Sequence, residues 1–143
     1  MLYYLFCQFR FFIIAFLPKK IIKNQYVIGV GNLSSGGTGK TPIEMKIASL
    51  FHGKVNIITR GYKRKLKDDI LGYGNQIISR YSASEIGDEA FFMAARFNNA
   101  FFVISTNKEK SFSTYELPHC VTIMDDSFHK YKIYQNLRIC VID

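Results

Sequence analysis

Residues 26–42 read YVIGVGNLSSGGTGKTP, and this stretch decides the fold of the chain. It begins with a short run of mostly β-branched and apolar residues, which is typical of a buried strand. Its middle is rich in glycine, and its end opens a segment in which apolar residues recur at helical spacing. A strand, a glycine-rich loop and a helix in this order suit the binding of a phosphate, because backbone N–H groups at the helix start point toward the ligand.

The strict phosphate-loop pattern is Gly-x-x-x-x-Gly-Lys-Ser/Thr, and Ser34 takes the place of its first glycine here. Because Lys40 and Thr41 keep their places, we predict that Lys40 reaches the β- and γ-phosphates of a nucleotide and that the Thr41 hydroxyl binds Mg²⁺. A plain glycine turn between a strand and a helix is the alternative interpretation. The predicted nucleotide-binding residues are Ser34, Ser35, Gly36, Gly37, Thr38, Gly39, Lys40 and Thr41.

The rest of the chain alternates between short apolar runs and amphipathic segments. The sequence predicts strands over residues 25–30, 54–59, 100–105, 120–124 and 138–143. It predicts helices over residues 40–51, 84–97 (with Ser84 as N-cap) and around 107–116, and a long loop over residues 60–84. Alternating strands and helices predict an α/β fold with a parallel sheet, right-handed crossovers and flanking helices, similar to that of phosphate-loop NTPases.

Several polar groups directly follow predicted strands. They comprise residues 31–41, Arg60–Tyr62, Ser105–Lys108 and Asp125–Asp126. In parallel sheets ligands bind at the carboxyl ends of the strands, so these groups are expected to converge on one edge. Asp125 and Asp126 end the run CVTIMDD, and one carboxylate after a buried strand can hold Mg²⁺. The alternative is an aspartate pair in a turn or at a helix cap.

The first twenty residues, MLYYLFCQFRFFIIAFLPKK, are apolar and aromatic. Between Leu2 and Leu17 only Gln8 and Arg10 are polar, and as a helix this segment extends about 24 Å, less than the roughly 30 Å of a hydrocarbon core. A helix lying in the membrane interface fits better, with the lysines that follow it facing anionic lipid. A buried helix of a larger core is the alternative. We therefore divide the chain into a membrane-associated segment with its basic flank (1–24) and a phosphate-loop domain (25–143).

The formal net charge of +8 is unevenly distributed. Residues 1–80 carry thirteen lysines and arginines against three acidic residues, whereas residues 81–143 carry six against eight. A basic half indicates an anionic partner, which is a membrane surface, a phosphate or a nucleic acid. No nucleic-acid-binding motif is present, and the basic residues cluster near the apolar segment and the phosphate loop, so no nucleic-acid partner is expected.

The three cysteines, Cys7, Cys120 and Cys140, show neither paired spacing nor a zinc pattern. Their spacing favours a reducing, cytosolic compartment for the part of the chain after the apolar segment. Because Cys120 and Cys140 lie in apolar runs, they are predicted to be buried packing residues.

Five motifs occur in an order and spacing that resemble one known family. They are VIGVGNLSSGGTGKTP, TRGYKRK, SEIGDEAFFMA, IMDDSFHK and LRICVID. From about Val27 to Asp143 the chain resembles tetraacyldisaccharide 4'-kinase, the lipid A 4'-kinase of Gram-negative bacteria. Ser34 in place of a glycine is how the phosphate loop of this family looks, which makes that motif the most specific of the five.

The resemblance implies a phosphate-loop kinase at the cytoplasmic face of the bacterial inner membrane. Such an enzyme transfers the γ-phosphate of ATP, with Mg²⁺, to the 4'-hydroxyl of a tetraacyl disaccharide 1-phosphate in lipid A biosynthesis. By resemblance Asp88 of the GDE motif is the catalytic carboxylate that helps to deprotonate the hydroxyl; the alternative is charge stabilisation of a helix start. Arg60, Lys63 and Arg64 are candidates to meet the substrate phosphate or lipid headgroups, and a solvated basic loop is the alternative.

The chain departs from the family in two respects. The family usually reads Asp-Asp-Gly-Phe-Gln-His where this chain reads DDSFHK, so Ser127 is expected to strain the turn if the position needs positive φ, and His129 stands where glutamine is usual. The family also continues into a second, C-terminal lobe that these 143 residues do not contain. These departures favour a second hypothesis, a membrane-associated ATP-binding module or truncated remnant without transferase activity.

Overall fold

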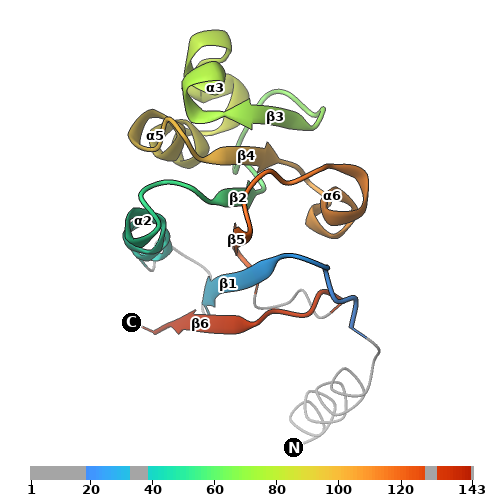
Figure 1. The fold of residues 1–143 in the computed structure, drawn as a ribbon. Helices are drawn as coiled ribbons and strands as arrows, with labels where there is room; N and C mark the ends of the chain where they lie inside the picture. Colours follow the sequence, from blue (N-terminus) through green and yellow to red (C-terminus); the bar gives the residue numbers. More distant parts are fainter. Residues whose placement is uncertain (1–18, 33–38, 128–131, 143) are drawn as a thin grey trace, which may run out of the picture.

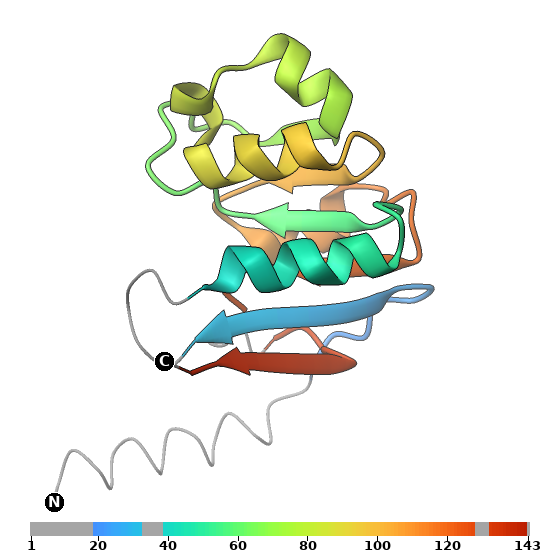
Figure 2. The ribbon, with the colours of Figure 1, turned by 90° about the vertical axis from the view of Figure 1, so that its left-hand side faces the viewer.

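The computed structural model describes residues 19–32, 39–127 and 132–142, and in these residues helices cover both faces of one sheet (Figures 1 and 2). The strands are β1 (Tyr26–Asn32), β2 (Asn56–Thr59), β3 (Ile70–Tyr73), β4 (Phe101–Ile104), β5 (Val121–Met124) and β6 (Leu137–Val141). The helices are α2 (Lys40–Leu50), α3 (Gly74–Arg80), α4 (Ala83–Ile86), α5 (Asp88–Arg96) and α6 (Lys108–Thr114).

The strands lie in the order β3-β4-β2-β5-β1-β6, and every neighbouring pair is parallel except β3 with β4. The α/β fold predicted from the sequence is confirmed, but the sheet is mixed rather than purely parallel. The prediction of one long loop over residues 60–84 was wrong, because this segment contains β3 and α3. Both elements depend on distant contacts: β3 pairs with β4, and α3 packs on α5.

The central strands are buried on both faces, and their side chains alternate between two hydrophobic clusters. Ile57 and Phe102 lie in the cluster that includes Ile47 of α2 and Met93 of α5, whereas Ile58 lies in the cluster that includes Phe112 of α6. Figure 1 shows the same arrangement, with α2, α3 and α5 on one side of the sheet and α6 on the other. Burial on both faces explains why these strands read as continuous apolar runs.

The helix predicted over residues 84–97 is in fact two helices, α4 and α5. They are separated at Gly87, whose φ of 97° interrupts the helical backbone. Ser82, rather than Ser84, begins the first of them: its backbone N–H and its hydroxyl each donate a hydrogen bond of 2.7 Å to the carboxylate of Glu85. These hydrogen bonds lower the pKa of Glu85 from its ordinary value of 4.5.

Three sequence expectations about single residues are corrected. Cys120 is exposed and Cys140 is half-buried, because one precedes β5 and the other lies on the edge strand β6. Ser127 does not have positive φ; Asp126 does, at 46°. Ser127 is buried, and its backbone N–H donates to Val30 O at 3.0 Å, so a serine fits here.

Two expectations fall on residues outside the described ranges. One is the membrane-associated helix of the first segment, and the other is His129. Within residues 19–32, 39–127 and 132–142 no helix has the length and apolar character needed to cross a membrane.

Candidate active site

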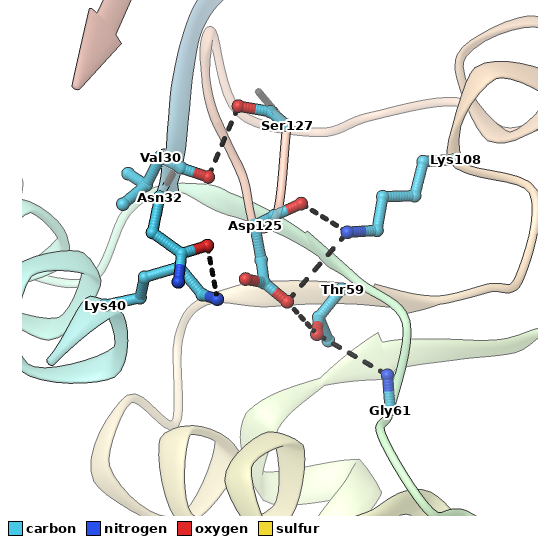
Figure 3. A network of polar contacts seen from close by, with 8 residues as sticks. All are labelled: Val30, Asn32, Lys40, Thr59, Gly61, Lys108, Asp125 and Ser127. Atoms are coloured by element: carbon cyan, nitrogen blue, oxygen red, sulfur yellow. Dashed lines mark hydrogen bonds and ion pairs between the residues drawn. The ribbon is translucent and has the colours of Figure 1, made fainter. Parts of the chain in front are cut away.

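The carboxyl ends of the parallel strands bring Asn32, Thr59 and Asp125 to one edge of the sheet (Figure 3). Lys40, the first residue of α2, lies at the same edge, and its Nζ donates to Asn32 Oδ1 at 3.2 Å. Gly39 forms the N-cap of α2 with φ of 74°, and no side-chain hydrogen bond caps this helix. The described helix start therefore leaves N–H groups available for an anion. Ser34–Thr38, five of the predicted nucleotide-binding residues, lie outside the described ranges.

Asp125 is fixed by side chains from two other elements. Thr59 Oγ1 donates to its Oδ2 at 2.9 Å, and Lys108 Nζ lies 3.9 Å from the same oxygen and also hydrogen-bonds the Asp125 carbonyl. Figure 3 shows Lys108 reaching Asp125 from α6, with Lys40 on the other side. Asp126, by contrast, is exposed in the turn that follows β5.

Sequence reasoning assigned no role to Thr59 or Lys108. Lys108 belongs to a polar stretch, residues 105–108, that follows a predicted strand, and this position indicated only that it lies at this edge of the sheet. That position does not reveal that the Lys108 side chain is only 3% exposed. Burial of a lysine beside a carboxylate is a tertiary property, because it depends on where α6 packs against the sheet.

Glu44 on α2 is a third neighbour of Asp125, and it was not predicted. It is 2% exposed. Burial raises the pKa of Glu44 well above its ordinary value, and the nearby carboxylate of Asp125 acts in the same direction. The charge of Lys108 opposes this effect.

Thr41 and Asp88 line one cavity of about 610 Å³. Glu89 lines it as well, together with the apolar or small residues Pro42, Met45, Ala83, Phe91, Phe92 and Ala95. The start of α2 and the start of α5 therefore face a common space. Thr41, predicted to bind Mg²⁺, and Asp88, predicted to meet the acceptor hydroxyl, both border it. The mainly apolar lining is suited to an acceptor with an apolar part.

The RGY and GDE motifs touch through their glycines. Gly61 has φ of 66° and Gly87 has φ of 97°. A Cβ at Gly61 would lie 2.4 Å from Ile86 O, and a Cβ at Gly87 would lie 2.8 Å from Tyr62 O. Only glycines permit this approach, which fixes the start of α5, and with it Asp88, relative to the end of β2.

Arg64 is buried in the loop between β2 and β3, and it hydrogen-bonds the backbone of that loop. It is 6% exposed, and its guanidinium donates to the carbonyls of Asp68, Ile104 and Lys67 at 2.9, 3.0 and 3.1 Å. Burial lowers the pKa of Arg64. This geometry does not fit the predicted contact of Arg64 with a substrate phosphate. Arg60 and Lys63 are exposed, and Lys63 Nζ lies 5.5 Å from the centroid of the Tyr62 ring.

The donor set at the sheet edge fits Mg²⁺. A threonine hydroxyl and an aspartate carboxylate are hard oxygen ligands, which this ion prefers. In the described part of the chain no group of three or more His, Cys, Asp or Glu residues is arranged to hold a metal. A site of few protein ligands suits an ion that keeps several water molecules and binds phosphate oxygens.

A largely parallel sheet, a helix that begins with Lys-Thr after a glycine-rich stretch, and an aspartate after a central strand define the class of phosphate-loop α/β proteins. The sequence model of the family described as tetraacyldisaccharide-1-P 4'-kinase matches residues 1–143. The chain therefore belongs to the tetraacyldisaccharide 4'-kinase family.

Relatives of this chain carry the same name. The tetraacyldisaccharide 4'-kinase of Campylobacter jejuni is 40% identical over 121 residues, covering 83% of this chain, and that of Aquifex aeolicus is 39% identical, covering 81%. The chain spans 38% of the length of each. The crystal structure of LpxK from Aquifex aeolicus in complex with ATP superimposes with a TM-score of 0.78 at 34% identity, covering 93% of this chain and 43% of that one.

Proposed function

We propose that this chain binds ATP with Mg²⁺ and forms the nucleotide-binding part of a lipid kinase. The reaction proposed is transfer of the γ-phosphate to the 4'-hydroxyl of a tetraacyl disaccharide 1-phosphate in lipid A biosynthesis. The observation that carries the proposal is the cavity shared by Thr41 of the phosphate loop and Asp88 of the GDE motif. The likeness to an ATP-bound LpxK and the names of the relatives support it.

The start of α2 would hold the nucleotide. Its first N–H groups and the positive end of its dipole would bind the phosphates. The Lys40 amine, which hydrogen-bonds Asn32 here, would turn to the β- and γ-phosphates and stabilise the charge that develops during transfer. Ser34–Thr38 would complete the loop around them.

Thr41 and Asp125 would hold the metal ion. We prefer Asp125 to Asp126 because Thr59 and Lys108 fix the Asp125 carboxylate at the strand edge, whereas Asp126 is exposed. When bound, Mg²⁺ supplies neutralisation of the charge on the phosphate oxygens.

Asp88 would accept the proton of the acceptor hydroxyl. As the hydroxyl oxygen bonds to the γ-phosphorus, the bond from that phosphorus to the bridging oxygen breaks, ADP leaves and the proton passes to the Asp88 carboxylate. Asp88 is exposed on the first turn of α5, so its carboxylate is accessible from the cavity that it lines.

We also propose that the protein acts at the cytoplasmic face of the inner membrane. The sequence supports this location. The first segment is apolar and aromatic, and the described residues that follow it expose Lys19, Lys20 and Lys23. Arg60 and Lys63, also exposed, are the remaining candidates for the substrate's 1-phosphate or for lipid headgroups.

Transfer of labelled γ-phosphate from ATP to detergent-dispersed tetraacyl disaccharide 1-phosphate tests the function. We expect label in the lipid with the unchanged chain and none with Asp88→Ala. Binding of Mg-ATP that is lost in Lys40→Ala, without transfer by the unchanged chain, would instead support the ATP-binding module. Absence of both binding and transfer would contradict the proposal.

A further inference from the structure

A second cavity lies on the side of the sheet opposite to α2 and α5. Its volume is about 620 Å³, and its lining includes Lys20, Lys110 and Lys132. Lys110 belongs to α6, and Figure 1 shows α6 on the other side of the sheet from α2 and α5. Thr41 and Asp88, by contrast, border a cavity formed by α2 and α5. The proposed reaction therefore has no use for the cavity beside α6.

The lysines of this cavity come from three parts of the chain that the fold brings together. The backbone N–H of Lys20 donates to the Lys132 carbonyl at 2.7 Å, and the N–H of Tyr134 donates to the Lys20 carbonyl at 3.0 Å. Ile133, between these two partners, is 1% exposed and packs in a hydrophobic cluster to which α6 contributes. The backbone of Lys20 and Lys132 is therefore fixed beside the helix that carries Lys110.

The charge of the lining favours an anion. Three lysines and one glutamate give the cavity a net charge of +2. The glutamate is Glu109, whose carboxylate lies 3.9 Å from the amine of Lys132. Within the described ranges neither Lys20 nor Lys110 forms an ion pair. Because like charges that are held close together repel one another, an anion between the amines would stabilise this arrangement. Phosphate groups form strong, charge-assisted hydrogen bonds with such amines.

The size and the position of the cavity favour a lipid headgroup over a free phosphate. Sites for small organic molecules typically have volumes of about 300–1,000 Å³, and this cavity lies in that range. The methylene stems of its lysines offer apolar surface to the carbon atoms of a headgroup. Lys20 follows closely after the apolar run from Leu2 to Leu17. The next residue, Ile21, is 71% exposed and adds apolar surface at the same edge.

We propose that this cavity binds the headgroup of an anionic phospholipid, with its phosphate between the amines of Lys20, Lys110 and Lys132. The inference goes beyond the proposed reaction and rests only on the proposed location at a membrane. A lipid bound beside α6 leaves the cavity that Thr41 and Asp88 border free for the substrate.

Native mass spectrometry tests the inference by counting the lipids that stay bound to a protein. The full 143-residue chain, released from non-ionic detergent, is titrated with phosphatidylglycerol or with zwitterionic phosphatidylcholine. The test variant combines Lys110→Gln with Lys132→Gln. The matched control combines Lys46→Gln with Lys54→Gln, which removes the same charge from exposed positions outside the cavity. Thermal unfolding of each variant checks that the fold is retained.

We expect the unchanged chain to retain one phosphatidylglycerol in preference to phosphatidylcholine. The affinity for phosphatidylglycerol should fall by about 30-fold in the test variant and by less than about threefold in the control. Glu109→Gln should act in the opposite direction and raise the affinity about two- to fivefold, because it removes the carboxylate that competes for Lys132. Glu116→Gln, an exposed change outside the cavity, should leave the affinity unchanged.

Three results would overturn the inference. Equal losses in the two double variants would show that the net charge of the chain governs binding. Equal retention of the two lipids by the unchanged chain would exclude a site for an anionic headgroup. Displacement of the lipid by inorganic phosphate at the same concentration would indicate a site for free phosphate. Failure of the proposed membrane location gives a different result, because the chain would then retain one phosphatidylglycerol in detergent and yet not sediment with vesicles of that lipid.

Discussion

Lys40 and Asn32 illustrate how single residues prepare the site. The amine of Lys40 lies 3.2 Å from Asn32 Oδ1, and so it is held at the carboxyl end of β1, where the phosphates are expected. Thr41 follows it on the first turn of α2, and Asp88 borders the same cavity as Thr41.

Replacement of Lys40 by methionine should weaken nucleotide binding. Hydrogen bonds to a charged group contribute about 1.5–3 kcal/mol, so we expect the Kd of ATP to rise by at least tenfold. Isothermal titration with Mg-ATP measures the change, and Lys46→Met, exposed on the same helix, is the control. Equal Kd values for the two variants would contradict the assignment of Lys40.

Replacement of Asp88 by asparagine should separate binding from transfer. The amide cannot accept the proton of the hydroxyl, and loss of a general base typically costs about 10²- to 10⁴-fold in rate. We expect that loss in phosphate transfer to the lipid, with ATP affinity within about twofold of the unchanged chain. Glu89→Gln is the matched control, because Glu89 is the next residue on α5 and lines the same cavity. A comparable loss of transfer in Glu89→Gln would count against Asp88 as the base.

At the scale of elements, glycines determine how the motifs meet. The contact between Gly61 and Gly87 joins the loop after β2 to the start of α5. It also separates α4 from α5, which the sequence pattern had merged into one helix. The helical periodicity of residues 84–97 was a true signal, but a φ of 97° at Gly87 overrides it locally.

Gly87→Ala should destabilise the domain more than Gly53→Ala does. Both glycines have positive φ, so the backbone strain of either alanine variant should lower the free energy of unfolding by about 1–2 kcal/mol. A Cβ at Gly53 meets only ordinary van der Waals contacts of the Phe97 ring, the nearest at 3.5 Å, whereas a Cβ at Gly87 would lie 2.8 Å from Tyr62 O. We expect an additional loss of about 1–3 kcal/mol for Gly87→Ala, measured by urea unfolding. Equal urea midpoints for Gly53→Ala and Gly87→Ala would mean that the loop after β2 moves away from the added Cβ at no cost in stability.

The hydrogen bonds of Glu85 at the start of α4 should appear in the pH dependence of stability. The hydrogen bonds from Ser82 lower the pKa of Glu85 below 4.5, so their contribution is fully present above that pH and is lost as the pH falls through the lowered pKa. We expect Glu85→Ala to lower the urea midpoint most at neutral pH, and we expect this effect to shrink as the pH falls below 4.5. Glu116→Ala, an exposed glutamate, provides the control. A loss that is as large in acid as at neutral pH would exclude the ionised form as the cause.

At the scale of the whole molecule, the uneven charge suggests an orientation against an anionic surface. Lys19 and Lys23 are exposed directly after the first segment of the chain. Each lysine near an anionic membrane contributes about 1 kcal/mol, and salt screens this attraction.

The double variant Lys19→Gln, Lys23→Gln should therefore bind anionic vesicles about 30-fold more weakly than the unchanged chain. Co-sedimentation with vesicles that contain phosphatidylglycerol measures the difference, which should narrow as salt is raised. Lys46→Gln with Lys54→Gln, two exposed lysines elsewhere on the chain, should bind nearly as well as the unchanged chain. Equal losses in both double variants would show that net charge, rather than the basic flank, governs binding.

Sequence by itself determined the features that follow from local patterns. The strand and the helix on either side of the glycine-rich stretch, the alternation of strands and helices, and the carboxylate after β5 could all be predicted. Each of them depends on residues close together in the chain. The family also follows from such motifs. The roles assigned to Asp88 and to the phosphate-loop residues stay predictions.

Only the tertiary structure decided which polar side chains are buried and which partners they contact. β3 exists because β4 lies beside it, and the Arg64 guanidinium is buried because a carbonyl forty residues away, that of Ile104, accepts its hydrogen bond. Asp125 meets Thr59 across 66 residues of sequence, and its ion pair with Lys108 depends on how α6 packs against the sheet. Burial and hydrogen-bond partners depend on contacts between segments that are distant in the sequence. A local sequence pattern therefore does not reveal them.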